Sequence, residues 1–199
     1  MAGRSLRTSS GSPNGDDTIQ SRAPSSPPIQ SSTDPLTDRV HLFGVEWTDG
    51  PMDRNAIEAI IGLTNEFTQQ YDLALQFFRR DSISGEEHVL SALLHALRAE
   101  AEERSRTRET SLDVLRYAAG ERQIRSAIAS TGLQIGLITY LCMVFIPAEG
   151  QPDVGNTTIR DTAFAFLRGI GFEITDMHPS CQGALLASLE RTALVDLKL

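Results

Sequence analysis

The sequence predicts an α+β domain, a small and mainly antiparallel sheet with helices packed on it, preceded by a disordered tail. Three observations predict it. A chain of 199 residues that is 40% hydrophobic has room for one well-packed domain. Residues 1–38 are rich in Ser, Pro and Thr and have almost no large apolar side chains. Beyond residue 39, short apolar runs typical of strands alternate with longer runs at helical spacing. We therefore expect a tail over 1–38 and a single domain over 39–199.

The first elements follow from apolar spacing and from residues that begin helices. Residues 40–47 predict a strand interrupted near Gly44. Pro51 and Asp53 then open a helix. Its apolar positions recur at helical spacing: Ile57, Ile60, Ile61, Thr64 and Phe67. Residues 71–78 suit either a strand or a helix end, and we favour the strand.

The middle of the chain predicts three helices. Ser84 and Glu87 have the spacing of a capping box, and the helix they open runs to about Arg104. A second helix starts at Thr110 and is interrupted by Gly120. A short helix over 121–130 follows, and Gly132 ends it as a C-terminal cap would.

The last third alternates strands and helices. The continuous apolar run 137–146, closed by Pro147, suits a central strand buried on both faces. We expect a loop over 150–156, a helix over 158–168 and a short extended segment over 172–175. A final helix over about 182–191 and a last strand over 192–197 complete the domain.

Charge and hydropathy restrict the classes of function. The net charge is -8, so contacts with phosphate would have to be local. Cys142 and Cys181 are too few for a disulfide framework, and Cys142 lies in an apolar run typical of a buried thiol. The first residues lack the apolar core of a secretory signal, and the most hydrophobic stretch is shorter than the roughly 20 residues that span a bilayer. We expect a soluble, cytoplasmic protein that does not associate with membranes.

Motifs of known catalytic sites are absent from the sequence. It has no nucleophile elbow, phosphate-binding loop, dinucleotide-binding turn or zinc-protease signature. His88 and His95 lie seven residues apart on one predicted helix, about 10 Å along its axis, which is too far for two ligands of one metal ion. We expect no metal, no cofactor and no catalytic residues. The alternative is a small hydrolase or transferase whose site forms in three dimensions around Glu87 and His88.

The segment 118–124 is a helix junction that carries arginines. Gly120 breaks one helix just before another begins, so free backbone N–H groups lie beside Arg122 and Arg125. Such a junction suits a phosphate or an RNA end. The alternative interpretation is an exposed junction whose arginines form salt bridges with neighbours.

Several stretches together resemble the kinase-binding subunit of the KEOPS complex, in its archaeal form. The most specific is Tyr-Ala-Ala-Gly-Glu-Arg-Gln-Ile at 117–124. The others are Asp-Ser-Ile at 81–83, Glu-His-Val-Leu at 87–90, Phe-Glu-Ile-Thr-Asp at 172–176 and Leu-Glu-Arg-Thr-Ala-Leu-Val-Asp-Leu at 189–197. The resemblance covers about residues 40–199. Asp113 departs from it, because the family usually has Glu there, and Lys is nearly absent from this chain.

The resemblance implies a subunit without catalytic activity in the complex that makes threonylcarbamoyladenosine in tRNA. It implies binding and regulation of the small atypical kinase/ATPase subunit, association with the other KEOPS subunits, and binding of the tRNA 3′ CCA end. The candidate RNA contacts are Arg122, Gln123, Arg125, His88 and Arg79. The candidate kinase contacts are Leu185, Leu186, Leu189 and Leu194, and each is equally compatible with an ordinary core position. A purely structural partner protein without RNA contact is a third interpretation.

Overall fold

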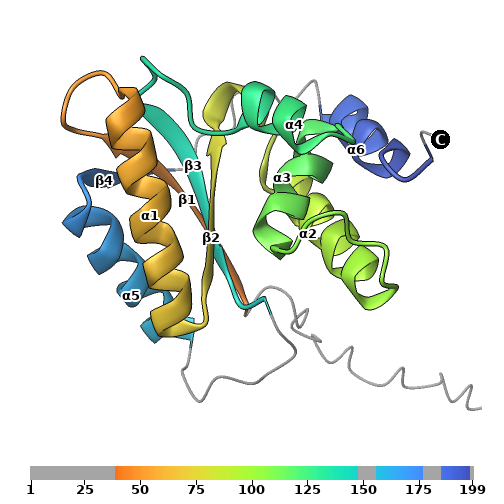
Figure 1. The fold of residues 1–199 in the computed structure, drawn as a ribbon, viewed down its shortest axis with the longest axis horizontal. Coiled ribbons are helices and arrows are strands. Elements are labelled where there is room, and N and C mark those ends of the chain that lie inside the picture. The colour runs from red at the N-terminus through yellow and green to blue at the C-terminus, as the bar shows by residue number, and fades with distance from the viewer. Residues whose placement is uncertain (1–38, 148–155, 177–184, 198–199) are drawn as a thin grey trace, which may run out of the picture. The chain divides into compact units, whose positions relative to one another are not determined.

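A computed structural model describes residues 39–147, 156–176 and 185–197. They form a four-stranded sheet and six α-helices (Figure 1). The elements are β1 (Val40–Trp47), α1 (Arg54–Tyr71), β2 (Ala74–Arg79), a 3-10 turn (Arg80–Ser82), α2 (Glu86–Ala101), α3 (Thr110–Ala119), α4 (Ile124–Thr131), β3 (Thr139–Phe145), α5 (Asn156–Gly169), β4 (Phe172–Thr175) and α6 (Leu185–Leu194). The predicted α+β class is confirmed.

The strand order in the sheet is β2-β3-β1-β4, and every pair is antiparallel. β3 lies inside the sheet, so the prediction of a central strand is confirmed. The predicted interruption of β1 is wrong, because Gly44 pairs with Leu141 on one side and Thr175 on the other. A Cβ atom at Gly44 would lie 2.5 Å from the Thr175 hydroxyl oxygen, so glycine serves the close approach of β4.

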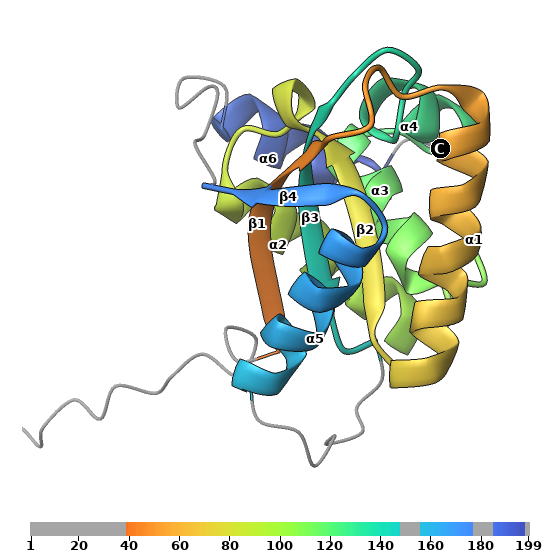
Figure 2. The ribbon, with the colours of Figure 1, turned by 90° about the vertical axis from the view of Figure 1, so that its left-hand side faces the viewer.

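The sheet separates two apolar cores, because side chains alternate along each strand. One face, with Phe43, Phe77 and Cys142, packs against α1 and α5. The other face, with Val40, Phe78 and Met143, packs against α2, α3 and α4 (Figure 2). α6 lies on that second side, where it packs mainly against α2 and α3. Cys142 is buried, as predicted, and burial raises the pKa of its thiol.

Two helix starts differ from the predictions. Asp53 caps α1 as expected, with its carboxylate accepting a hydrogen bond from the Ala56 amide at 2.7 Å. The capping box at Ser84 is wrong: Gly85 is the N-cap of α2, and the Ser84 hydroxyl pairs with Ser188 on α6. The helix predicted from residue 121 begins at Ile124. A local capping motif was overridden by a partner that lies 104 residues away in the sequence.

The C-terminal segment is the largest correction. The predicted strand over 192–197 is wrong, because α6 continues through Leu194 and a turn follows. Alternation in the sequence misled the prediction, since Thr192 and Val195 are buried at helical spacing. The predicted loop over 150–156 and the start of the final helix at 182–184 fall mainly outside the described residues. In the described part of the chain, every helix is too short or too polar to cross a membrane.

Candidate functional site

The junction between α3 and α4 begins at Gly120, which adopts a left-handed conformation with φ 68°. Its amide bonds the Tyr117 carbonyl at 3.1 Å, and the Glu121 amide bonds the Arg116 carbonyl at 3.0 Å. These two bonds satisfy two of the last four carbonyls of α3. Glu121 and the next two residues then lead the chain into α4.

The N-terminus of α4 forms the second half of the junction. Gln123 is its N-cap in an extended conformation, and the Gln123 side chain makes no capping bond. The first amides of a helix have no partner within that helix. Gln123 and Arg125 are exposed and Arg122 is half-buried. Among the described residues, neither arginine has a hydrogen bond or an ion pair, so the interpretation of a junction closed by salt bridges is not supported.

A third arginine, which the sequence analysis missed, lies over Gly120. A Cβ atom at Gly120 would lie 3.0 Å from the Cβ of Arg191 on α6. The exposed Arg191 guanidinium reaches the Ser188 hydroxyl at 3.1 Å. Arg191 belongs to the resembling stretch 189–197, which was the signal that could have indicated it. The junction therefore has arginines from two parts of the chain. Arg122 and Arg125 lie at the start of α4 and in the residues before it, and Arg191 lies on α6.

His88 lies beneath the junction and is fully buried. Its Nε2 is 3.0 Å from the Ala118 carbonyl, and its Nδ1 accepts a bond from the Ser84 amide. This pairing requires the tautomer with the proton on Nε2. Burial, supported by the nearby positive charge of Arg191, lowers the His88 pKa, while the bond to Ala118 opposes this. His88 therefore ties α2 to the end of α3.

These contacts change two predictions. His88 has no exposed surface, so it cannot touch an RNA that binds the folded protein, and we remove it from the candidate contacts. Both of its ring nitrogens are occupied, so it also does not offer a free base beside the exposed Glu87. The alternative of a hydrolase or transferase site at this pair thus finds no support. Among the described residues, no group of three or more His, Cys, Asp and Glu side chains could hold a metal ion.

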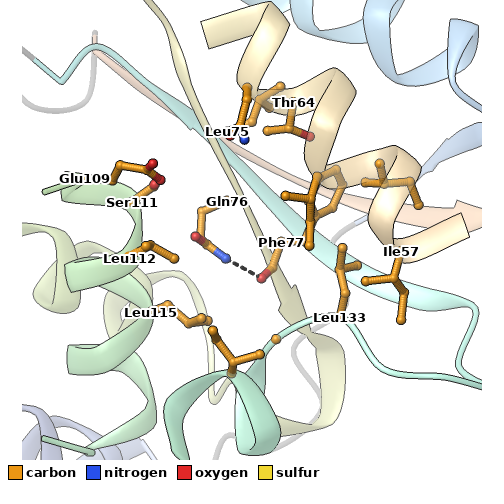
Figure 3. Close-up of a pocket in the computed structure, with 15 residues that line it drawn as sticks. Ile57, Thr64, Leu75, Gln76, Phe77, Glu109, Ser111, Leu112, Leu115 and Leu133 are labelled. Atoms are coloured by element: carbon orange, nitrogen blue, oxygen red, sulfur yellow. Dashed lines mark hydrogen bonds between the residues drawn. The ribbon is translucent and has the colours of Figure 1, made fainter. Parts of the chain in front are cut away.

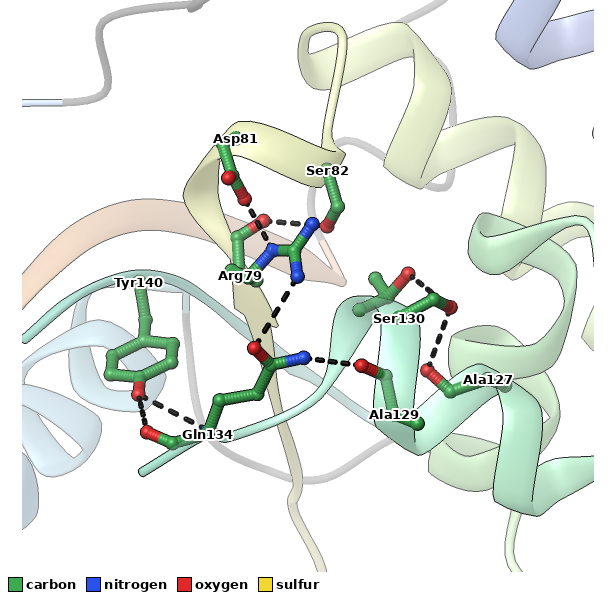
Figure 4. A network of polar contacts seen from close by, with 9 residues as sticks. Arg79, Asp81, Ser82, Ala127, Ala129, Ser130, Gln134 and Tyr140 are labelled. Carbon is green, nitrogen blue, oxygen red and sulfur yellow. Dashed lines mark hydrogen bonds and ion pairs between the residues drawn. The ribbon is translucent and has the colours of Figure 1, made fainter. Parts of the chain in front are cut away.

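Arg79 lies at the end of β2 in a separate polar network (Figure 4). It pairs with Asp81, and its guanidinium donates to the Gln134 side chain at 3.3 Å. The Gln134 carbonyl accepts from the Tyr140 hydroxyl at 2.9 Å. Arg79 thus ties β2 to the segment after α4. No contact among the described residues joins Arg79 to Arg122 or Arg125, so the structure does not bring it into the junction.

α6 has an unusual distribution of polar and apolar residues. Ser188 and Thr192 are completely buried against the rest of the domain. The Ser188 hydroxyl lies 2.6 Å from that of Ser84, and the Thr192 hydroxyl donates to the Ser188 carbonyl at 3.0 Å. Leu186, in contrast, is 82% exposed. A helix at the surface of a soluble domain normally buries its apolar face.

The candidate kinase contacts therefore divide by exposure. Leu186 and Leu194 are exposed, and Leu185 and Leu189 are half-buried. Leu197, in the turn after α6, is 70% exposed. Leu186, Leu194 and Leu197 form what we call the α6 leucine face. On a helix, positions 186, 190, 193 and 194 share one side, so the exposed Glu190 and Ala193 lie between Leu186 and Leu194.

The end of α6 is anchored by polar contacts. The Tyr117 hydroxyl donates to Asp196 at 2.6 Å, and Arg104 pairs with the same carboxylate at 3.1 Å. Burial opposes ionisation of Asp196, but the bonds from Tyr117 and Arg104 dominate and lower its pKa. His95 stacks on the Tyr117 ring with centroids 5.5 Å apart. Residues from α2, α3 and the C-terminal turn thereby fix the orientation of α6.

α3 also contains a buried ion pair. Asp113 and Arg116 are 1% and 2% exposed, and their charged atoms are 3.2 Å apart. Ser105 donates a further hydrogen bond to Asp113, and the Arg116 guanidinium lies 5.1 Å from the centre of the Tyr117 ring. Arg116 is therefore an internal residue and does not add to the positive surface of the junction.

A groove that the sequence analysis did not anticipate lies on the other side of α3 and α4. Its volume is about 160 Å³, and it runs between α1, the outer strand β2, and α3 with α4 (Figure 3). Its lining residues lie far apart in the sequence, which explains why no sequence motif indicated it.

A scan against protein-family models and a search of curated proteins both gave no match to the chain.

Proposed function

We propose that this chain is a non-catalytic subunit of the KEOPS tRNA-modification complex that binds and regulates the small kinase/ATPase subunit and holds the tRNA 3′ CCA end. The observation that carries the proposal is the α6 leucine face, on a helix that buries hydroxyls and exposes leucines. The resembling stretches supply the identity of the partner. Their convergence supports it, because 87–90, 117–124 and 189–197 meet through His88, Ala118, Gly120 and Arg191.

The exposed leucines suit a protein interface. Each large apolar side chain left in water forgoes about 1.5–3 kcal/mol of burial free energy, which a partner could recover. The polar contacts of Asp196 and the hydroxyl pair of Ser188 hold α6 in place before any partner binds. A preformed interface loses less conformational entropy on binding. The kinase subunit would therefore contact a rigid helix.

The junction suits a single-stranded RNA end. Arg122 and Arg125 can contact phosphates, and the unpaired amides at the start of α4 add hydrogen-bond donors for the same oxygens. Arg191, which packs against Gly120, adds a third arginine to the junction. Single-stranded RNA is held by such backbone contacts together with base stacking. The net charge of -8 disfavours binding of RNA elsewhere on the surface.

The kinase interface is tested by binding of the purified kinase subunit to the Leu186→Arg variant, measured by calorimetry. We expect a loss of about 2 kcal/mol or more, the size found at the centre of interfaces. Leu63→Arg on α1 is the matched control, because Leu63 is also exposed and lies on the opposite side of the sheet. Equal affinities of the Leu186→Arg variant and the unmodified chain would contradict the proposed kinase interface.

The RNA interface is tested by titrating intact tRNA and tRNA trimmed of its CCA end. Arg122→Glu should weaken binding of intact tRNA and make the affinity less dependent on salt. The slope of log affinity against log salt should fall by about 0.7 for each phosphate that Arg122 neutralises. Arg168→Glu, an exposed arginine on α5, is the control for net charge. If trimmed and intact tRNA bind equally, the junction does not hold the CCA end. If the chain binds the kinase subunit but not tRNA, the interpretation that remains is a purely structural partner protein.

A further inference from the structure

We infer that the outer edge of β2 is a docking site for an extended peptide segment of a partner protein, which brings one large apolar side chain and one basic side chain. The site is the groove lined by α1, β2, α3 and α4, and we call it the β2 groove. It involves none of the residues assigned above to the kinase or to RNA. The inference therefore stands independently of the proposed function.

β2 is an edge strand. It pairs with β3 on one side and is the last strand of the described sheet on the other. An edge strand presents main-chain donors and acceptors that an added strand can use. α1 and α3 lie on either side of this edge, so a partner segment would reach it between the two helices (Figure 3).

The hydrogen bond of Gln76 indicates where a strand would pair. The Gln76 side-chain amide donates to the Phe77 carbonyl at 2.8 Å, and this bond lies within the β2 groove (Figure 3). The carbonyl is thus satisfied by a neighbouring side chain. A main-chain N–H of an incoming strand can replace that donor, because the Gln76 amide can move to solvent or to the peptide.

The walls of the β2 groove are apolar and incompletely covered. Ile61 on α1 is 50% exposed and Ile128 on α4 is 43% exposed. Leu112 and Leu115 on α3 complete the apolar lining. The volume of about 160 Å³ is close to that of engineered cavities that accept benzene, so it suits one aromatic or leucyl side chain.

The charge around the β2 groove selects a basic segment. Of the described residues that line it, only Glu109 is charged. Residues 40–78, which supply α1 and most of β2, contain one arginine and six acids. Glu58, three residues before Ile61 on α1, is exposed, whereas Glu66 lines a separate pocket between α1 and α5. A lysine or arginine next to the apolar anchor would be attracted to this region, whereas an acidic segment would be repelled.

The test begins with selection of random short peptides that bind the full chain. An enriched peptide is synthesised and its affinity is measured by fluorescence polarisation. We expect Ile61→Glu and Ile128→Glu each to weaken binding about tenfold or more. Ile135→Glu is the matched control, because Ile135 is exposed at 64% and does not line the groove. All three positions are exposed, so the variants should fold.

Replacing single peptide amides by esters then tests strand pairing. We expect affinity to fall at every second position, because alternate amides of a strand face the partner edge. Losses at a helical period, or affinity that does not depend on Ile61 and Ile128, would overturn the inference. Failure to enrich any basic apolar peptide would also overturn it. If the chain self-associates and Ile128→Glu abolishes this self-association, the occupant is a second copy of the chain. If Ile128→Glu shifts the NMR resonances of residues 1–38, the occupant is the chain's own N-terminal segment. Either result would overturn the inference.

Discussion

The backbone of Gly120 lies directly against Arg191, so that a Cβ atom added at Gly120 would be 3.0 Å from the Arg191 Cβ. Glycine is needed here for two reasons, its positive φ of 68° and the close approach of α6. The contact joins the junction, which supplies Arg122 and Arg125, to the helix that carries the α6 leucine face. A change at either element can therefore alter both proposed interfaces.

Gly120→Ala should destabilise the domain by about 1–3 kcal/mol, since a left-handed non-glycine residue is strained and the new methyl group meets Arg191. Gly50→Ala is the control for the strain alone, because Gly50 has φ 81° and nothing within 4 Å of its added Cβ. Urea unfolding measures both variants. The contact with α6 is unimportant if the two variants lose the same stability.

His88→Gln should flatten the dependence of stability on pH. The folded-state pKa of His88 is lowered from 6.5, so below that pH the unfolded chain binds a proton at this histidine more readily than the folded chain does. The free energy of unfolding therefore falls as the pH drops below about 6.5 in the unmodified chain. Urea unfolding between about pH 7.5 and pH 5 checks this. Part of the pH dependence of stability should remain in the variant, because burial also lowers the pKa of His95. Superimposable pH profiles would refute the role of His88.

Tyr117→Phe should remove the bond to Asp196 and cost about 1.5–3 kcal/mol, as for bonds to charged groups. The double variant Tyr117→Phe/Asp196→Asn should cost less than the sum of the single variants, because both remove the same contact. Tyr71→Phe is the control, since Tyr71 is 46% exposed. Amide exchange in α6 should rise in the variant at position 117. Additive effects would mean that the contact does not hold α6.

Asp113→Ala should be among the most harmful substitutions in α3. It leaves the buried Arg116 without its carboxylate, and loss of one member of a buried ion pair costs about 3–5 kcal/mol. Asp113→Leu combined with Arg116→Leu should be closer to the unmodified chain, because no buried charge is left unpaired. Thermal unfolding compares them. A double variant as unstable as Asp113→Ala would contradict this explanation.

Local patterns in the sequence were sufficient to predict the strands β1, β2, β3 and β4 and all six helices, with errors at several ends. The Asp53 cap and the break at Gly120 were also predictable, because caps and left-handed turns depend on a few neighbouring residues. The Ser84 cap was not, because Ser188 competes for the same hydroxyl. The strand over 192–197 failed for a related reason, since a short apolar alternation fits a buried helix face as well as a strand.

The candidate site was predictable only in part. Arg122, Gln123 and Arg125 were identified because they lie within five residues after Gly120. The structure leaves Gln123 and Arg125 exposed and Arg122 half-buried. His88 was misjudged because its burial depends on α3 and α6, which lie elsewhere in the sequence. Arg191 was missed because only the packing of α6 brings it to Gly120. The roles in binding RNA and the kinase stay predictions.

The sequence by itself determined the fold class, the order of the elements and the position of the glycine-broken junction, because hydrophobic period and capping act over a few residues. The tertiary structure alone decided that α6 buries Ser188 and Thr192 and exposes Leu186. It alone also formed the β2 groove from α1, β2, α3 and α4. Which side of a helix is covered depends on neighbours that are distant in sequence, and no local pattern contains that information.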